Sequence, residues 1–258
     1  MVISMINLQA IELIFGLITT ILAYFIVVSV SGFFRAWVAS KMGDQTPAYM
    51  GFLTLNPAAH IDFVGFIFMV LFGFGWGKYI PIASFNINGK FRKIRIFIAN
   101  FSDIFANFVI ATVSMIALVI YFGADILRMS LPMMLLNCLR SVDYSGIFGF
   151  VKGIVVIKSR LEILYPATSS IAISFIMVIV ATMYLSVLLA ALNFIISGFW
   201  YFYMMFNSFS SSRVYNDNFL LLLIPMFLIF FFIEPLRVFV ATGIGHVVTI
   251  LAKALGFY

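Results

Sequence analysis

A stretch of fifty residues without a charged side chain most constrains how this chain can fold. No Asp, Glu, Lys or Arg occurs between residues 163 and 212. At about 1.5 Å per helical residue, this stretch is far longer than one crossing of a bilayer core about 30 Å thick. We therefore expect a helix over 168–196, a break near Ser197 and Gly198, and then an aromatic stretch. With 64% hydrophobic and only 9% charged residues in the whole chain, against about 25% charged in a typical soluble domain, an integral membrane protein is indicated.

Other apolar runs predict further membrane helices. Residues 13–34 and 104–124 are long enough to cross a bilayer. Residues 63–77 are uncharged but short, so this segment is tilted, re-entrant or continued by its flanks. A last main span begins at 219–233, before Glu234 and Pro235 interrupt the run. The predicted fold class is an all-α polytopic membrane protein, a single domain over residues 1–258 with about five to six transmembrane helices.

The polar connections carry the positive charge. Five Lys and Arg residues lie between residues 78 and 95, where a strand-like piece and a turn-forming Asn-Ile-Asn-Gly sequence predict a short strand or hairpin near 79–90. Residues 145–157 predict an amphipathic helix at the membrane interface. The net charge of +6 suits anionic lipid headgroups. It does not indicate nucleic-acid binding, because the aromatic residues lie mostly inside apolar runs. The single Cys138 excludes an internal disulfide.

Two motifs resemble a known family. The sequence SGFFRAWVA at 31–39 precedes a Gly-Asp pair at 43–44 and GFLTLNPAAHID at 51–62. Together they resemble the bacterial branch of the site-2 protease family, the intramembrane zinc metalloproteases, whose members carry HExxH, AWVA, Gly-Asp and GxLTLNPxxHID. The resemblance continues in order through FGWGKYIPI at 74–82, the helix start at 98–111 and the segment 188–202. It implies a site-2-protease-like helical bundle.

The resemblance also implies that the catalytic groups of the family are missing here. The two metal-binding histidines fall on Ser31 and Arg35, the catalytic glutamate falls on Gly32, and the third ligand, an aspartate, falls on Tyr201. HExxH binds zinc because residues four apart share one helix face, with the glutamate beside them as general base. Arg35 would repel a metal ion and Gly32 has no group that accepts a proton. We expect no catalytic residues, no bound zinc and no other cofactor.

Arg35 is an unusual residue at the end of an apolar run, and two interpretations stay open. A cation there is costly unless it reaches the interface or is paired. It is either an interfacial anchor or the occupant of the vacated metal position. In the second case its guanidinium replaces the charge of zinc and pairs with Asp103 or Tyr201.

Two asparagines in apolar helices, Asn107 and Asn193, are candidates for a substrate or partner groove. Asparagines in membrane helices most often bond to neighbouring helices. In the family these positions lie near the active site, where they help to hold an extended substrate. Their presence here suits a protein that binds a transmembrane segment without cutting it.

The loop motif at Asn56, Pro57, His60 and Asp62 is expected to have a structural role and not to bind metal. His246 stands alone in an apolar segment, where hydrogen bonding to a neighbouring helix is expected.

Three functions remain in competition. The first is a catalytically inactive homologue in the bacterial inner membrane that binds or regulates a transmembrane protein or a catalytically intact homologue. The second is an active zinc metalloprotease with rearranged ligands, which needs at least three donors although the chain offers only two imidazoles. The third is a transporter or channel component, which the expected break near residue 197 and Glu234 would suit.

Overall fold

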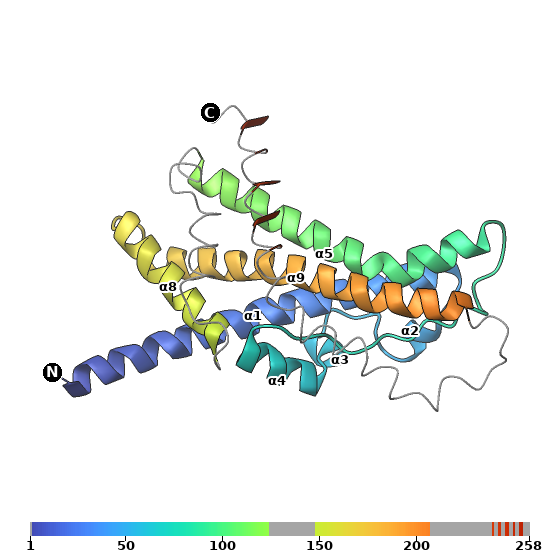
Figure 1. Ribbon diagram of the computed structural model, residues 1–258, viewed down its shortest axis with the longest axis horizontal. Helices are drawn as coiled ribbons and strands as arrows, with labels where there is room; N and C mark the ends of the chain where they lie inside the picture. The colour runs from blue at the N-terminus through green and yellow to red at the C-terminus, as the bar shows by residue number, and fades with distance from the viewer. Residues whose placement is uncertain are drawn as a thin grey trace.

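The computed structural model describes residues 2–123 and 148–206, with isolated residues between 239 and 254, and within the helices it describes side chains from residue 10 to residue 198. Three helices are long: α1 (Val2–Met42), α5 (Arg92–Phe122) and α9 (Ser170–Phe206). Shorter helices are α2 (Thr46–Tyr49), α3 (Pro57–His60), α4 (Phe63–Phe72) and α8 (Gly149–Leu164). The described residues contain no β-strand, so the architecture is helical as expected (Figure 1).

Three of these helices are long and apolar enough to cross a membrane, over Ala10–Met42, Arg92–Phe122 and Ser170–Gly198. The first contains the predicted span 13–34, and the other two cover most of the predicted spans 104–124 and 168–196. α1 and α9 run in one direction and α5 runs in the other (Figure 1). The chain is therefore a membrane protein. The expected last span, which starts at 219–233, lies outside the described residues, and the total of five to six spans stays a prediction.

The predicted break at Ser197 and Gly198 is wrong. α9 continues through both residues to Phe206. A single glycine lowers helix stability by only about 1 kcal/mol relative to alanine, and proline, which would remove a backbone donor, is absent from this part of α9. A side chain at Gly198 would meet open space, with nothing within 4 Å. Neither packing nor the backbone therefore requires the helix to end there.

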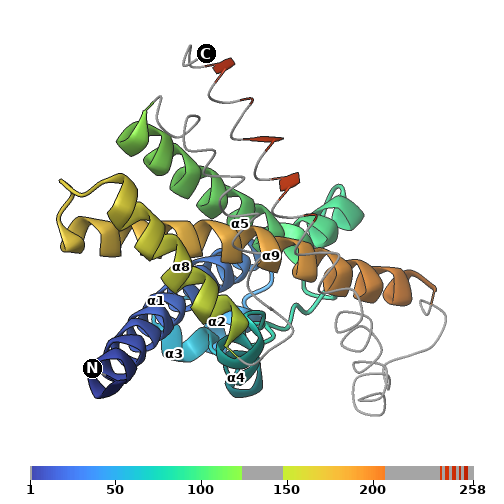
Figure 2. The ribbon, with the colours of Figure 1, turned by 60° about the vertical axis from the view of Figure 1, so that its left-hand side comes forward.

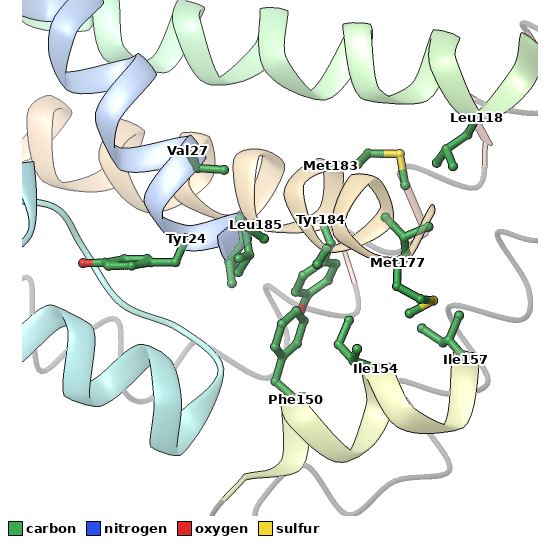
Figure 3. Packing of buried hydrophobic residues seen from close by; sticks show 14 of the residues in the cluster. Tyr24, Val27, Leu118, Phe150, Ile154, Ile157, Met177, Met183, Tyr184 and Leu185 are labelled. Atoms are coloured by element: carbon green, nitrogen blue, oxygen red, sulfur yellow. The ribbon is translucent and has the colours of Figure 1, made fainter. Parts of the chain in front are cut away.

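The main core joins all three long helices with α8. Tyr24 and Val27 of α1, Leu118 of α5 and Met177 of α9 belong to one buried cluster. α8 contributes its apolar face, including Phe150, Ile154 and Ile157, which Figure 3 shows pointing toward α9. The helix predicted at 145–157 therefore exists, but it begins at Gly149, extends to Leu164 and packs its apolar face against α1 and α9.

The uncharged segment 63–77 forms a helix, α4, over only its first ten residues. The Asp62 side chain accepts from the backbone N–H of Gly65 at 2.8 Å and begins α4. Gly73 ends it in the left-handed conformation, with φ of 69°. The chain then returns past α4, with Gly75 against Gly65. Figure 2 shows α2, α3 and α4 grouped beside α1.

The predicted strand or hairpin near 79–90 is wrong. The described backbone there has no strand, and an isolated bridge joins Ile61 to Gly77 instead. The polar backbone groups of this segment bond to side chains: Arg92 donates to the carbonyl oxygens of Ser84 and Ile87, each at 2.9 Å. Side-chain partners replace the second strand that a hairpin would supply.

Asp44 joins the end of α1 to this loop. It is fully buried, and its carboxylate accepts hydrogen bonds from Thr46, from the backbone N–H of Ala83 at 2.7 Å and from the Asn86 amide at 2.9 Å. Burial would raise its pKa, but these hydrogen bonds outweigh that effect, so the pKa of Asp44 lies below its usual value. The loop is thus fixed to the end of α1 by an ionised carboxylate.

We predict that acid weakens this connection. Because the pKa of Asp44 is lower in the folded protein, its stabilisation is complete above the unfolded-state pKa of about 3.9 and is lost as the pH falls through the folded-state pKa. The thermal midpoint of the detergent-solubilised protein should fall below about pH 4. Asp44→Asn should lower stability at pH 7 by about 1–3 kcal/mol and flatten the acid dependence. Glu162→Gln is the control, since it removes a surface carboxylate of an i,i+4 pair; an equal effect from it would contradict the assignment.

Candidate functional site

Arg35 of α1 and Asp103 of α5 form a buried ion pair. The Nη1 atom of Arg35 lies 2.8 Å from Oδ2 of Asp103, and the two side chains are only 9% and 11% exposed. The pair was one of the two expected for Arg35, and the structure confirms it. The alternative interpretation, an interfacial anchor, would keep its charged end exposed, whereas the Arg35 side chain is buried.

Further contacts surround the guanidinium. Its Nη1 atom also donates to the backbone oxygen of Asn100 at 3.3 Å. The ring of Tyr79 lies 5.9 Å from the guanidinium carbon, within the range of a cation–π contact. The Nε atom is buried and has no hydrogen-bond partner among the described residues. One donor of a buried cation is thus available to a further acceptor.

Gly32 lies directly against the imidazole of His60. A Cβ atom at Gly32 would overlap Nδ1 of His60 and would lie 2.9 Å from Cε1. Real Cβ atoms essentially never approach so closely. The imidazole ring of His60, on α3, therefore occupies the space that a side chain at position 32 would need. The glycine at position 32 permits this contact between α1 and α3.

The loop motif holds this imidazole in place. The Asn56 side chain accepts from the N–H of Ala58 at the start of α3, where Pro57 is the first helical residue. Nε2 of His60 lies 2.7 Å from the Thr54 carbonyl oxygen. Since a carbonyl only accepts, Nε2 carries the hydrogen and Nδ1 presents a lone pair toward Gly32. Burial lowers the pKa of His60, and the smaller opposing effect of the Thr54 bond does not reverse this, so the ring is neutral.

Ser31 and Asn107 lie one turn further into the bundle. They are four residues from Arg35 and Asp103 in opposite chain directions, and α1 and α5 are antiparallel, so both reach the same level. The Ser31 hydroxyl donates to the Val27 carbonyl of its own helix at 2.7 Å. Asn107 is 0% exposed, yet neither Nδ2 nor Oδ1 has a hydrogen-bond partner among the described residues. The sequence marked Asn107 as a candidate, but it could not show that both polar atoms of the amide are unpaired.

The other residues that the sequence marked as candidates do not all lie near the Arg35–Asp103 pair. Asn193 is half-buried in α9, beside Phe194, whose ring meets that of Phe101 on α5. Asn107 lies about 1.7 turns further along α5 than Phe101. Tyr201 lies in the last turns of α9, but its side chain is outside the described part of the chain, so its meeting with Ser31 and Arg35 stays a prediction. His246 is exposed where it is described.

The residues at positions 31, 32 and 35 do not fit a zinc ion. The Ser31 hydroxyl is engaged with its own helix, Gly32 offers no donor, and Arg35 places a paired cation there. Zinc sites need at least three ligands, typically imidazole, thiolate or carboxylate. Among the residues described, no three His, Cys, Asp or Glu side chains gather.

A segment of 48 residues is 48% identical to a protein of Bacillus subtilis (strain 168) described as "Putative zinc metalloprotease YwhC". The similar segment covers 19% of this chain and 22% of that protein, so the chain matches about a fifth of the length of this curated relative. No family model matches the chain, and no solved structure matches it. The similarity supports a site-2-protease-like relationship over this segment.

We predict strong energetic coupling between Arg35 and Asp103. Removing one partner leaves an unpaired buried charge, so Arg35→Met or Asp103→Leu alone should destabilise the protein by about 3–5 kcal/mol. The double variant should restore most of that loss, because replacing a whole buried pair by apolar side chains is often neutral or stabilising. Thermal unfolding in detergent measures all four proteins. Additive effects in the double variant would contradict the coupling.

We predict that Gly32→Ala destabilises the protein through His60. The added methyl group must displace the imidazole, at a cost of about 1–3 kcal/mol. In a His60→Ala background the same change should cost less, because the ring is gone. Gly198→Ala is the matched control: it also lies in a long helix but meets open space, so it should raise stability by up to about 1 kcal/mol. If the cost of Gly32→Ala is unchanged without His60, the proposed contact is not its cause.

Proposed function

We propose that this chain is a non-catalytic relative of the site-2 proteases that binds a transmembrane segment of a partner protein in the bacterial inner membrane. The partner is another membrane protein, with a catalytically intact homologue as one candidate. The proposal rests on the zinc metalloprotease similarity together with the contents of the candidate site.

The proposal that the protein is non-catalytic rests mainly on the paired cation at position 35. In a HExxH helix, positions 31 and 35 would supply two imidazoles to one metal. Here the guanidinium of Arg35 lies in that position and its charge is balanced by Asp103 at 2.8 Å. We propose that this ion pair replaces the metal electrostatically and holds α1 and α5 in the arrangement that zinc would otherwise hold. The His60 ring, packed on Gly32, takes the space of a general base.

The binding part of the proposal rests on Asn107. Buried polar atoms are nearly always hydrogen-bonded, and an unpaired buried amide is costly. Asn107 has both an unpaired donor and an unpaired acceptor. A residue in an extended segment presents its own N–H and C=O on the same side, so one residue of an extended partner segment matches both. The Nε atom of Arg35, in the layer one helical turn away, is a further buried donor without a partner among the described residues.

A second candidate function is an intramembrane zinc metalloprotease with rearranged ligands. The identity of 48% to a protein described as a zinc metalloprotease favours it. In that case His60, whose Nδ1 lone pair is unpaired, would be one ligand. Cleavage of a co-reconstituted transmembrane segment that is abolished by His60→Ala would support this candidate against the first.

We predict that Asn107→Leu separates binding from stability. Leucine has the same number and branching of side-chain heavy atoms and removes the unpaired amide, so the thermal midpoint should stay the same or rise. Loss of two hydrogen bonds to the partner should weaken binding about tenfold or more. The measurement is quantitative co-purification of membrane proteins with the full-length chain in mild detergent. Ser114→Ala is the control, because Ser114 is a buried polar residue two turns further along the same face of α5.

Two outcomes of the co-purification measurement would contradict the proposal. Unchanged recovery of every co-purifying membrane protein with Asn107→Leu would contradict a role for Asn107 in binding a partner. Equal losses with Ser114→Ala would show that any buried change on α5 has the same effect, and that Asn107 has no special role.

A further inference from the structure

The end of the bundle where α1 finishes and α5 begins carries an excess of exposed positive charge. Between residues 36 and 102 the chain has six Lys and Arg side chains but only two acids, Asp44 and Asp62. Asp44 is fully buried and accepts four hydrogen bonds. Asp62 begins α4 by accepting from Gly65. The described part of this region thus contains no exposed unpaired carboxylate to offset the cations.

The cations of the loop divide into two groups. Arg92 and Arg95 donate to loop carbonyl oxygens at Ser84, Ile87 and Asn88, at 2.6–2.9 Å. These arginines fix the shape of the loop. Lys90 and Lys93 are exposed and take part in no ion pair among the described residues. The two lysines are therefore available to an anion outside the chain.

Two large aromatic side chains close to these lysines in the chain are exposed, and the ammonium of Lys90 lies 5.5 Å from the centre of the Phe91 ring. Phe85 is 76% and Phe91 is 65% exposed. Phe91 has φ of 63°, in the left-handed region that bulky residues rarely adopt. The cost of this conformation is tolerated because the loop is fixed on both sides, by Asp44 through Asn86 and by Arg92 through Ile87. A strained backbone that directs a phenylalanine outward has an explanation if the ring enters an apolar medium.

We propose that Lys90 and Lys93, with Phe85 and Phe91, form a binding surface for anionic phospholipid headgroups of one leaflet. The ammonium groups bind the headgroup phosphate, and the two rings lie at the boundary between headgroups and acyl chains. Lysine and aromatic side chains are the ones that occur together at membrane interfaces. Since α5 continues from this loop as a membrane-length helix, the surface lies at the depth where headgroups are found. It is independent of the site at Arg35 and Asn107.

The positive charge of this surface indicates that its ligand is an anionic lipid. An excess of basic residues beside a membrane helix binds anionic lipids, and each lysine near such a surface strengthens binding about fivefold, which is ~1 kcal/mol converted at 25 °C. An acidic segment of a protein partner would also match the lysines, but it would leave the two exposed rings unexplained. The lipid satisfies both features.

The test is lipid binding by the purified full-length protein in neutral detergent, titrated with phosphatidylglycerol or with phosphatidylcholine and followed by native mass spectrometry. The wild-type protein should prefer phosphatidylglycerol, and the preference should fall as salt is added. Lys90→Gln with Lys93→Gln should weaken phosphatidylglycerol binding by about 25-fold. The matched control, Lys152→Gln with Arg160→Gln, removes two exposed cations of α8 and should change binding less than about twofold.

A second variant keeps the test informative if the lysine variant folds poorly. Phe91→Gly relieves the left-handed strain, so it should hold or raise the thermal midpoint while it lowers phosphatidylglycerol binding. Equal binding of the two lipids by the wild-type protein would overturn the proposal. Unchanged phosphatidylglycerol binding in the variant that lacks both lysines would also overturn the proposal. The same holds if that variant loses a protein partner but still binds phosphatidylglycerol as the wild type does.

Discussion

The buried ion pair between Arg35 and Asp103 is the interaction on which the arrangement of α1 and α5 depends. In a membrane interior a lone cation is costly, by about 2.5 kcal/mol or more at the centre, and a lone carboxylate is costly for the same reason. Each charge is therefore tolerated only where the other is present. The pair fixes which faces of the two antiparallel helices meet, and this brings Ser31 and Asn107 to one level.

Around this pair the site combines a tight packing contact with buried polar atoms that have no hydrogen-bond partner among the described residues. The contact of His60 with Gly32 closes the space beside α1, while Nδ1 of His60, Nε of Arg35 and the amide of Asn107 have no partners among the residues described. Donors and acceptors are both represented among these groups. Such a site is suited to hydrogen bonding with a polar backbone, and we propose that this is its use.

The helices could be predicted from the sequence because charge-free runs of membrane length leave few alternatives. Their ends could not, because α5 begins at Arg92, twelve residues before its apolar run, where loop carbonyl oxygens accept from the arginine. The Arg35–Asp103 pair, 68 residues apart, was accessible only through the resemblance to a family. The contact of Gly32 with His60 was not accessible, because a glycine carries no sign of which distant side chain needs its space.

Zinc content, measured by elemental analysis of the purified protein, distinguishes an ion pair from a metal site, since we propose that the charge of Arg35 lies where a metal would bind. The protein is prepared without chelators, equilibrated with zinc and then separated from free metal. We expect far less than one zinc per chain, with no increase in zinc when Arg35 is kept and Asp103 is replaced by asparagine. A content of about one zinc per chain, lost when His60 is replaced by alanine, would contradict this expectation and favour a protease with rearranged ligands.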